Sequence, residues 1–202
     1  MFVTFEGIDG AGKSTQARLL AEDLGADTVL LREPGGTPAG ERVRELIKDP
    51  DLALSPRAEL MLFCAARAEL VETVIRPALR DGRRPRRDRF ADSTLAYQGI
   101  VRGLGPELVA TLNAAAVSGC VPDRTVLLRI EPERSTGRAA DRLDFGTDRF
   151  EREGLDFQRR LAAAFDEIAS AEPDRFRVVD GSGSVAEVQE AVRTAVGVGA
   201  PR

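Results

Sequence analysis

Cysteine is scarce in this chain of 202 residues, which contains only Cys64 and Cys120. Both lie inside otherwise apolar segments, and two cysteines cannot form the dense disulfide framework of small secreted domains. We therefore expect two buried thiols in a protein that works in a reducing, cytoplasmic compartment.

Long apolar runs and a charge excess of one sign are also missing. No window approaches the roughly 20 apolar residues of a membrane span. The strand-like FVTFE follows Met1 directly, so we expect no secretory signal. The net charge is −4, with acidic and basic residues interspersed. These absences predict no membrane partner and no nucleic-acid partner held by a basic field.

Lysine is also scarce in this chain. It occurs only at Lys13 and Lys48, while arginine supplies every other basic side chain. A lysine retained against such a bias marks a position where the chemistry needs a compact, flexible cation. Lys13 fits this interpretation, whereas Lys48, at the end of a predicted helix, is expected to be a surface lysine.

Short apolar strands alternate with longer segments of helical periodicity along the whole chain. This order predicts an α/β fold, in which a parallel sheet carries helices on both faces. With 43% hydrophobic residues, the length suits one domain over residues 1–202. The predicted strands are 2–6, 28–33, 124–131 and 176–180, and the predicted helices are 14–24, 39–48, 56–79, 91–101, 106–118, 149–171 and 185–196.

The strongest motif is GIDGAGKS, which follows the first strand and precedes the first helix. It has the spacing of a phosphate-binding P-loop: glycines let backbone N–H groups approach phosphate oxygens, and the helix N-terminus favours the anion. Lys13 can reach the β and γ phosphates, and the Ser14 hydroxyl can bind Mg²⁺. The predicted ATP-binding residues are Gly7, Ile8, Asp9, Gly10, Ala11, Gly12, Lys13, Ser14 and Thr15.

The P-loop alone leaves the phosphoryl acceptor open. A GTPase would add an N-K-x-D segment, but the only asparagine, Asn113, lies in TLNAAA. Phosphates would repel the Asp9 carboxylate, so it should turn outward to a hydroxyl or to hydrated Mg²⁺, or accept local backbone N–H groups. A kinase for some small acceptor and a non-catalytic nucleotide-binding protein both fit these features.

Five separated segments narrow the choice: FEGIDGAGKST, REPGGTPAGE, ELMLFCAAR, DRFADSTLAYQG and PDRTVLL. In this order and at these separations they resemble bacterial thymidylate kinase. The resemblance implies transfer of the γ-phosphoryl group of ATP to dTMP, giving dTDP, with Mg²⁺. It also implies the nucleoside monophosphate kinase architecture, an arginine-rich lid and a homodimer.

The resemblance also implies where dTMP binds. Phe63 would stack on thymine, and Arg67, four residues later on the same helix face, would hydrogen-bond the base. A buried Arg67 needs a ligand or a carboxylate beside it. Asp88 would face hydrated Mg²⁺ together with Ser14. The predicted dTMP-binding residues are Asp9, Glu33, Pro34, Phe63, Arg67, Arg89, Thr94, Tyr97 and Gln98.

Phosphoryl transfer needs a cation near the moving group, and the P-loop offers no arginine between Gly7 and Gly12. A lid over about residues 134–152 would therefore supply it, most simply through Arg142 or Arg149. The alternative is that these arginines form ion pairs on a solvated helix. When the two lid arginines are included, the predicted catalytic residues are Lys13, Asp88, Arg89, Arg142 and Arg149.

One stretch departs from the pattern, because residues 83–87, RRPRR, stand where the family has an apolar central strand. Proline removes a ladder hydrogen bond, and buried guanidinium groups are costly without partners. Three hypotheses follow: a shortened and displaced strand, a catalytically weakened relative that still binds nucleotide, or an error in the gene sequence. Aromatic residues are sparse around the run, which disfavours nucleic-acid binding.

Overall fold

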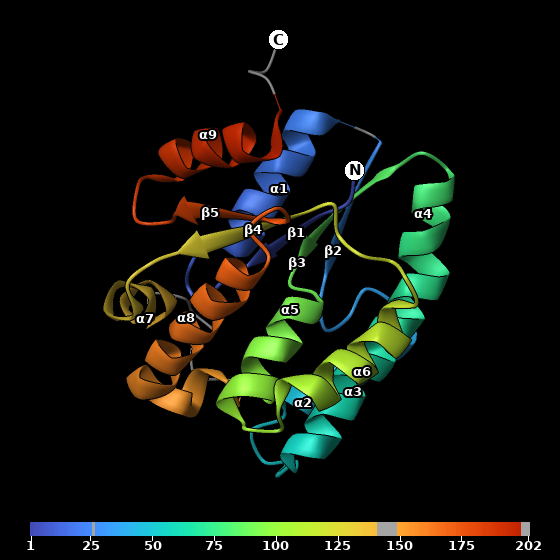
Figure 1. Ribbon diagram of the computed structural model, residues 1–202, viewed down its shortest axis with the longest axis vertical. Helices are drawn as coiled ribbons and strands as arrows, with labels where there is room; N and C mark the ends of the chain where they lie inside the picture. The colour runs from blue at the N-terminus through green and yellow to red at the C-terminus, as the bar shows by residue number, and fades with distance from the viewer. Residues whose placement is uncertain (26, 141–148, 199–202) are drawn as a thin grey trace.

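A computed structural model describes residues 1–25, 27–140 and 149–198. Five parallel strands form one sheet in the order β2-β3-β1-β4-β5, which confirms the predicted fold class (Figure 1). The strands are β1 (Val3–Glu6), β2 (Thr28–Arg32), β3 (Arg84–Asp88), β4 (Arg124–Arg129) and β5 (Phe176–Asp180). The α-helices are α1 (Lys13–Leu24), α2 (Pro38–Lys48), α3 (Pro56–Leu70), α4 (Arg76–Arg80), α5 (Ala91–Thr94), α6 (Pro106–Val117), α7 (Pro132–Ala140), α8 (Gly154–Ala171) and α9 (Val185–Val196).

Helices cover both faces of the sheet. α1 and α9 contact each other and the strands on one face, while α4 and α8 contact strands on the other face (Figure 1). The main core joins strand residues such as Phe5 and Val126 to Leu161 and Phe165 of α8, all buried. None of the helices in the described part of the chain has the length and apolar content that a bilayer crossing requires.

Local sequence explains where several helices begin. The Ser55 hydroxyl accepts a hydrogen bond from the Ala58 N–H, and Pro56 occupies the first helical position of α3, as predicted. Thr37 and Pro38 start α2 in the same way. At α9, Ser184 and Glu187 form a reciprocal capping box.

Two of the predicted helices contain π-helical turns. The segment predicted as 56–79 is α3, then a π turn at Val71–Ile75, then α4, in which Pro77 offers no N–H to the helix. The segment predicted as 91–101 is α5 followed by a π turn at Leu95–Val101. Within the described residues, the helix predicted from 149 is a 3₁₀ turn at Glu151–Glu153 and then α8, because Gly154 has φ +78° and breaks the helix.

The arginine-rich segment is a regular strand at the centre of the sheet, so the hypothesis of a shortened and displaced strand is wrong. β3 pairs with β2 from Arg84 to Asp88 and with β1 from Arg86 onward. Pro85 precedes the first residue that pairs with β1, so the β1–β3 ladder loses no donor to it. The strand therefore delivers Asp88 and its neighbours to the carboxyl edge of the sheet.

Burying Arg86 in the arginine-rich strand β3 has a desolvation cost. Its side chain is fully buried, and its Nη1 donates to the carbonyl oxygens of Met1, at 2.7 Å, and Pro85, at 3.0 Å. Its Nε and Nη2 find no hydrogen-bond acceptor among the described residues. Burial, together with the neighbouring Arg84, lowers the pKa of Arg86 to about 10.

We expect the substitution Arg86→Met to raise the free energy of unfolding by about 1 kcal/mol or more, because an apolar chain removes a poorly solvated buried charge. Urea denaturation of the two proteins measures the difference. A variant less stable than the wild type by about 1 kcal/mol would show that the two carbonyl contacts outweigh the desolvation cost.

Candidate active site

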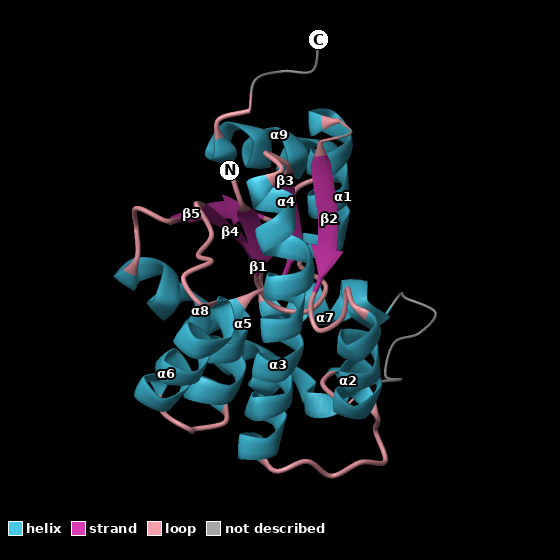
Figure 2. Cartoon of the chain, turned by 90° about the vertical axis from the view of Figure 1, so that its right-hand side faces the viewer, coloured by secondary structure: helices cyan, strands magenta, loops and turns pink. Residues whose placement is uncertain are grey.

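Most of the predicted site residues meet in a cleft of about 1220 Å³ at the carboxyl ends of β1, β2 and β3. The carboxyl end of β2 points toward α2 (Figure 2). Residues of α2 line the cleft, among them Arg44 and Ile47. Ligands collect at this edge of parallel sheets because the loops there lie beside helix N-termini. Of the predicted ATP-binding residues, all but Gly7 and Ile8 line the cleft: Asp9, Gly10, Ala11, Gly12, Lys13, Ser14 and Thr15.

The phosphate loop is packed closely against the protein. Gly7 has φ +135°, and a Cβ there would lie 2.6 Å from the Leu128 carbonyl oxygen. Gly10 lies against α7, where the Ser135 hydroxyl donates to the Asp9 carbonyl oxygen. Neither glycine position has room for a side chain, which is the reason the motif needs glycine there.

Lys13 folds back over this loop. Its side chain is buried, and its Nζ donates to the Ile8 carbonyl oxygen at 2.7 Å. Burial, and then the positive charge of Arg89, lower the pKa of Lys13 to about 8. The ammonium group is thus held beside the loop amides, in the place where phosphate oxygens would satisfy it.

Ser14 and Asp88 come together, as the sequence predicted for a metal pair. The Ser14 hydroxyl donates to Asp88 Oδ2, while Asp88 Oδ1 is buried without a hydrogen-bond partner among the described residues. No group of three His, Cys, Asp or Glu side chains in the described part of the chain could enclose a metal. Mg²⁺ suits such a pair, because it takes few protein ligands and completes its shell with water and substrate phosphates.

Arg89 lies between the P-loop and the acceptor side of the cleft. It has φ +68°, forms an ion pair with Asp9, and donates to the Ser93 hydroxyl at 3.2 Å. Its guanidinium carbon lies 5.2 Å from the centre of the Tyr97 ring, and the Tyr97 hydroxyl is 3.4 Å from Asp9 Oδ2. The structure thus brings Asp9, Arg89 and Tyr97 together.

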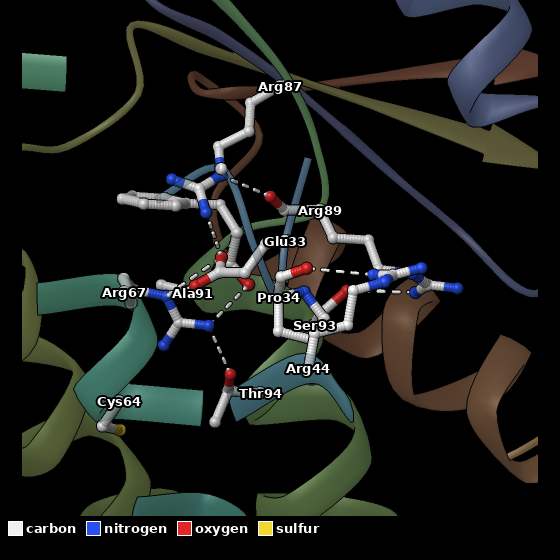
Figure 3. A network of polar contacts seen from close by, with 12 residues as sticks. Glu33, Pro34, Arg44, Cys64, Arg67, Arg87, Arg89, Ala91, Ser93 and Thr94 are labelled. Atoms are coloured by element: carbon white, nitrogen blue, oxygen red, sulfur yellow. Dashed lines mark hydrogen bonds and ion pairs between the residues drawn. The ribbon is translucent and has the colours of Figure 1, made fainter. Parts of the chain in front are cut away.

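Of the two partners expected for a buried Arg67, a ligand or a carboxylate, the structure shows a carboxylate. Its Nε lies 3.0 Å from Glu33 Oε1, and the side chains are only 1% and 2% exposed. Its Nη2 donates to the Thr94 hydroxyl at 2.6 Å (Figure 3). Its Nη1 donates to Asn113 Oδ1 at 2.6 Å. Pro34 borders the same pocket and accepts a hydrogen bond from Arg44 through its carbonyl oxygen, at 2.9 Å.

Phe63 and Gln98 also line the cleft. The Phe63 ring is half-buried and meets the edge of Phe150, with centroids 6.1 Å apart. The Gln98 side-chain amide donates to Glu59 Oε1 at 2.7 Å. Phe63 therefore presents an apolar surface to the cleft, while Gln98 is fixed by a buried carboxylate.

The same carboxylate, Glu59, holds one of the two favoured lid arginines. Arg149 Nη2 lies 2.7 Å from Glu59 Oε2, and its Nε donates to the Ile47 carbonyl oxygen at 3.1 Å. Arg149 thus makes these contacts with α2 and α3, so its role in phosphoryl transfer stays a prediction. Arg142 lies outside the described residues.

Sequence reasoning missed Glu6, at the end of β1. This carboxylate is fully buried and accepts hydrogen bonds from the Phe90 N–H, at 2.7 Å, and the Ser93 hydroxyl, at 2.5 Å. Burial, and then the negative charge of Asp92, raise the pKa of Glu6 to about 7. The sequence feature that could have identified Glu6 as a site residue is its position directly before the P-loop.

This raised pKa predicts a pH dependence of stability. Between the ordinary pKa of 4.5 and about 7, the folded state binds a proton at Glu6 that the unfolded state has released. The contribution of Glu6 to the free energy of unfolding is therefore fully present below 4.5 and lost as pH rises through 7. Urea denaturation across this window, in the wild type and in Glu6→Gln, should show a decline that the variant lacks. Parallel curves of unfolding free energy against pH in the two proteins would contradict the raised pKa of Glu6.

Comparison with known proteins gives one consistent result. A family model described as thymidylate kinase matches residues 5–192. A thymidylate kinase from Dinoroseobacter shibae is 49% identical over 191 residues, covering 92% of this chain and 91% of the relative. One from Pelobacter propionicus is 46% identical over 199 residues, covering 95% and 91%. The crystal structure of thymidylate kinase from Ehrlichia chaffeensis matches with a TM-score of 0.80 and 33% identity, over 98% of each chain.

Proposed function

Because this chain belongs to the thymidylate kinase family, we propose that the cleft beside β3 is where it transfers the γ-phosphoryl group of ATP to dTMP. The chain is an ATP-dependent dTMP kinase that forms dTDP. The observation that carries the placement of the site is the meeting of the P-loop, Asp88 and Arg89 in one cleft.

The donor half of the site binds ATP. The amides between Gly7 and Ser14 and the N-terminus of α1 face the phosphates, and Lys13 neutralises their charge. Ser14 and Asp88 would hold Mg²⁺, because Asp88 Oδ1 has no hydrogen-bond partner within the described part of the chain. When bound, Mg²⁺ neutralises negative charge on the phosphates during transfer.

The acceptor half binds dTMP. Arg89 would clamp the phosphate, since its guanidinium group stands at the junction with the P-loop and offers paired donors. Phe63 stacks on thymine, and Arg67 and Thr94 face the edge of the base. Tyr97 packs under the deoxyribose, while the acceptor-binding set is completed by Asp9 at the 3′-hydroxyl and by Glu33, Pro34 and Gln98 at the pocket wall.

The lid over about residues 134–152 would complete the site. Closing it excludes water and brings a further cation to the moving phosphoryl group. α7, which forms its first part, already contacts the P-loop through Ser135. Arg142 and Arg149 remain our candidates for that cation.

Initial rates of ADP formation with a panel of acceptors test this assignment. dTMP should be used in preference to dUMP, UMP, AMP and shikimate, and chelating the divalent cation with EDTA should stop the reaction. Preferred turnover of another acceptor would reject the placement of the thymine pocket. Activity that survives EDTA would reject Ser14 and Asp88 as a Mg²⁺ site.

We also propose that residues 1–202 form one kinase domain that acts as a homodimer in the cytoplasm without binding nucleic acid. Exposed apolar side chains on the neighbouring helices α3 and α6, Met61 at 54% and Leu108 at 37%, favour a self-association surface (Figure 1). Light scattering coupled to size-exclusion chromatography should give the mass of two chains, and a monomer mass would overturn the proposed dimer.

A further inference from the structure

Arg87 is a fully buried cation in the central strand β3 that none of the roles above uses. Its Nη2 lies 2.9 Å from Glu33 Oε2, with both side chains no more than 2% exposed. Its Nε donates to the Arg89 carbonyl oxygen at 3.0 Å, and its guanidinium carbon lies 4.8 Å from the centre of the Phe90 ring. One side chain therefore joins β3 to two different walls of the acceptor pocket (Figure 3).

The first wall is the base side. Glu33 lies between two guanidinium groups, with Arg87 on the β3 side and Arg67 on the α3 side (Figure 3). A carboxylate shared by two buried cations has little freedom to rotate, because either rotation abandons one ion pair. The direction of Arg67, and of its hydrogen bond to Thr94, consequently depends on where Arg87 holds Glu33.

The second wall is the phosphate side. Arg89 has a left-handed backbone, at φ +68°, which costs free energy in a residue with a side chain. The hydrogen bond from Arg87 Nε to the Arg89 carbonyl oxygen stabilises this backbone conformation. The conformation in turn sets the direction in which the Arg89 side chain leaves β3 toward Asp9 and Ser93.

From these contacts we propose that Arg87 is a positioning residue for the acceptor nucleotide, an inference that rests on the proposed site. Arg87 acts through Glu33 and Arg67 on the base subsite and through the Arg89 backbone on the phosphate subsite. Within the described part of the chain, the side chain of Arg87 contacts Glu33, Arg89 and Phe90 and not the P-loop, so its effect falls on dTMP and not on ATP.

Arg86 offers a matched control, since it precedes Arg87 in the same strand and is equally buried. Its hydrogen bonds run to the carbonyl oxygens of Met1 and Pro85, away from the cleft. If buried arginines in β3 matter only for folding, Arg86→Met and Arg87→Met should have the same effect on kinetics. If Arg87 positions the acceptor site, only Arg87→Met should weaken dTMP binding.

The test measures KM for dTMP and for ATP, together with dTMP affinity by calorimetry, in the wild type, Arg86→Met, Arg87→Met and Arg87→Lys. We expect Arg87→Met to raise KM for dTMP by about tenfold or more, the size set by losing one charge-assisted hydrogen bond, with KM for ATP within about twofold. Arg87→Lys should fall in between, because an ammonium keeps the charge beside Glu33 but lacks the planar fork that reaches both acceptors.

Thermal unfolding of each variant shows that it is folded, and the kinetic constants of folded protein decide the result. An unchanged KM for dTMP in both Arg87 variants, or equal rises in KM for dTMP and ATP, would overturn the proposal. Failure of the wild type to bind dTMP would instead overturn the proposed function, so the two failures are distinguishable.

Discussion

Replacing Lys13 with alanine is expected to lower dTMP-dependent ADP formation by about 10²- to 10³-fold at saturating ATP and dTMP. Lys13 belongs to the P-loop itself, and its Nζ lies 2.7 Å from the Ile8 carbonyl oxygen of the same loop. Phosphoryl transfer depends on neutralising charge on the phosphates, so losing this cation removes stabilisation of the transition state.

Coupled-enzyme assays measure the loss. Arg159→Ala is a suitable control, because Arg159 is an exposed arginine in a surface ion pair with Glu133 on α7. It should keep the wild-type rate. Retention of more than about a tenth of the activity by Lys13→Ala would exclude a direct role for Lys13 in transfer.

Glu33→Gln should give the largest loss of stability, about 3–5 kcal/mol in the free energy of unfolding. The Glu33 carboxylate lies between Arg67 and Arg87, and all three side chains are at most 2% exposed. An amide of the same shape leaves two buried like charges facing each other without their counter-ion. The same change should also weaken dTMP binding, because Arg67 loses its carboxylate.

Urea denaturation compares Glu33→Gln with Glu22→Gln, which breaks an exposed i,i+4 pair with Arg18 on α1. The surface change should cost less than about 1 kcal/mol. Similar losses in the two variants would mean that Glu33 does not hold the arginines of the acceptor pocket together.

Local patterns made part of this site predictable. The P-loop is contiguous, so the meeting of a strand, glycines, Lys13 and a helix start follows from sequence order. Arg67 was expected to need a ligand or a carboxylate beside it, because a buried guanidinium without a partner is costly. That the partner is Glu33 could not be read from local sequence, since Glu33 follows β2 and meets α3 only in the folded chain.

The arginine run shows the reverse case. A central strand of arginines conflicts with the pattern of a buried strand, and a shortened and displaced strand was one of three hypotheses that the sequence left open. β3 nevertheless keeps its place, because Arg87 meets Glu33 and Phe90, while Arg86 reaches the Met1 carbonyl oxygen. Glu33 and Met1 lie in distant segments of the sequence, so no local rule could reveal them as partners.

Helix boundaries and the lid were the least predictable parts. The π turn before Pro77 and the start of α8 at Gly154 each depend on a single residue within a longer apolar pattern. Arg149 was placed at the moving phosphoryl group by resemblance, whereas its observed partner is Glu59 on α3, four residues before Phe63. Spacing alone could have suggested that Glu59 shares a helix face with Phe63.

Transfer of labelled phosphate tests the central claim most directly. The wild-type chain is incubated with ATP labelled in the γ-phosphate, Mg²⁺ and dTMP, and the products are separated. We expect the label to appear in the β-phosphate of dTDP, and Lys13→Ala to lower the rate of its appearance by about 10²- to 10³-fold. Label released as inorganic phosphate, with none in dTDP, would contradict the claim that this cleft joins ATP to dTMP.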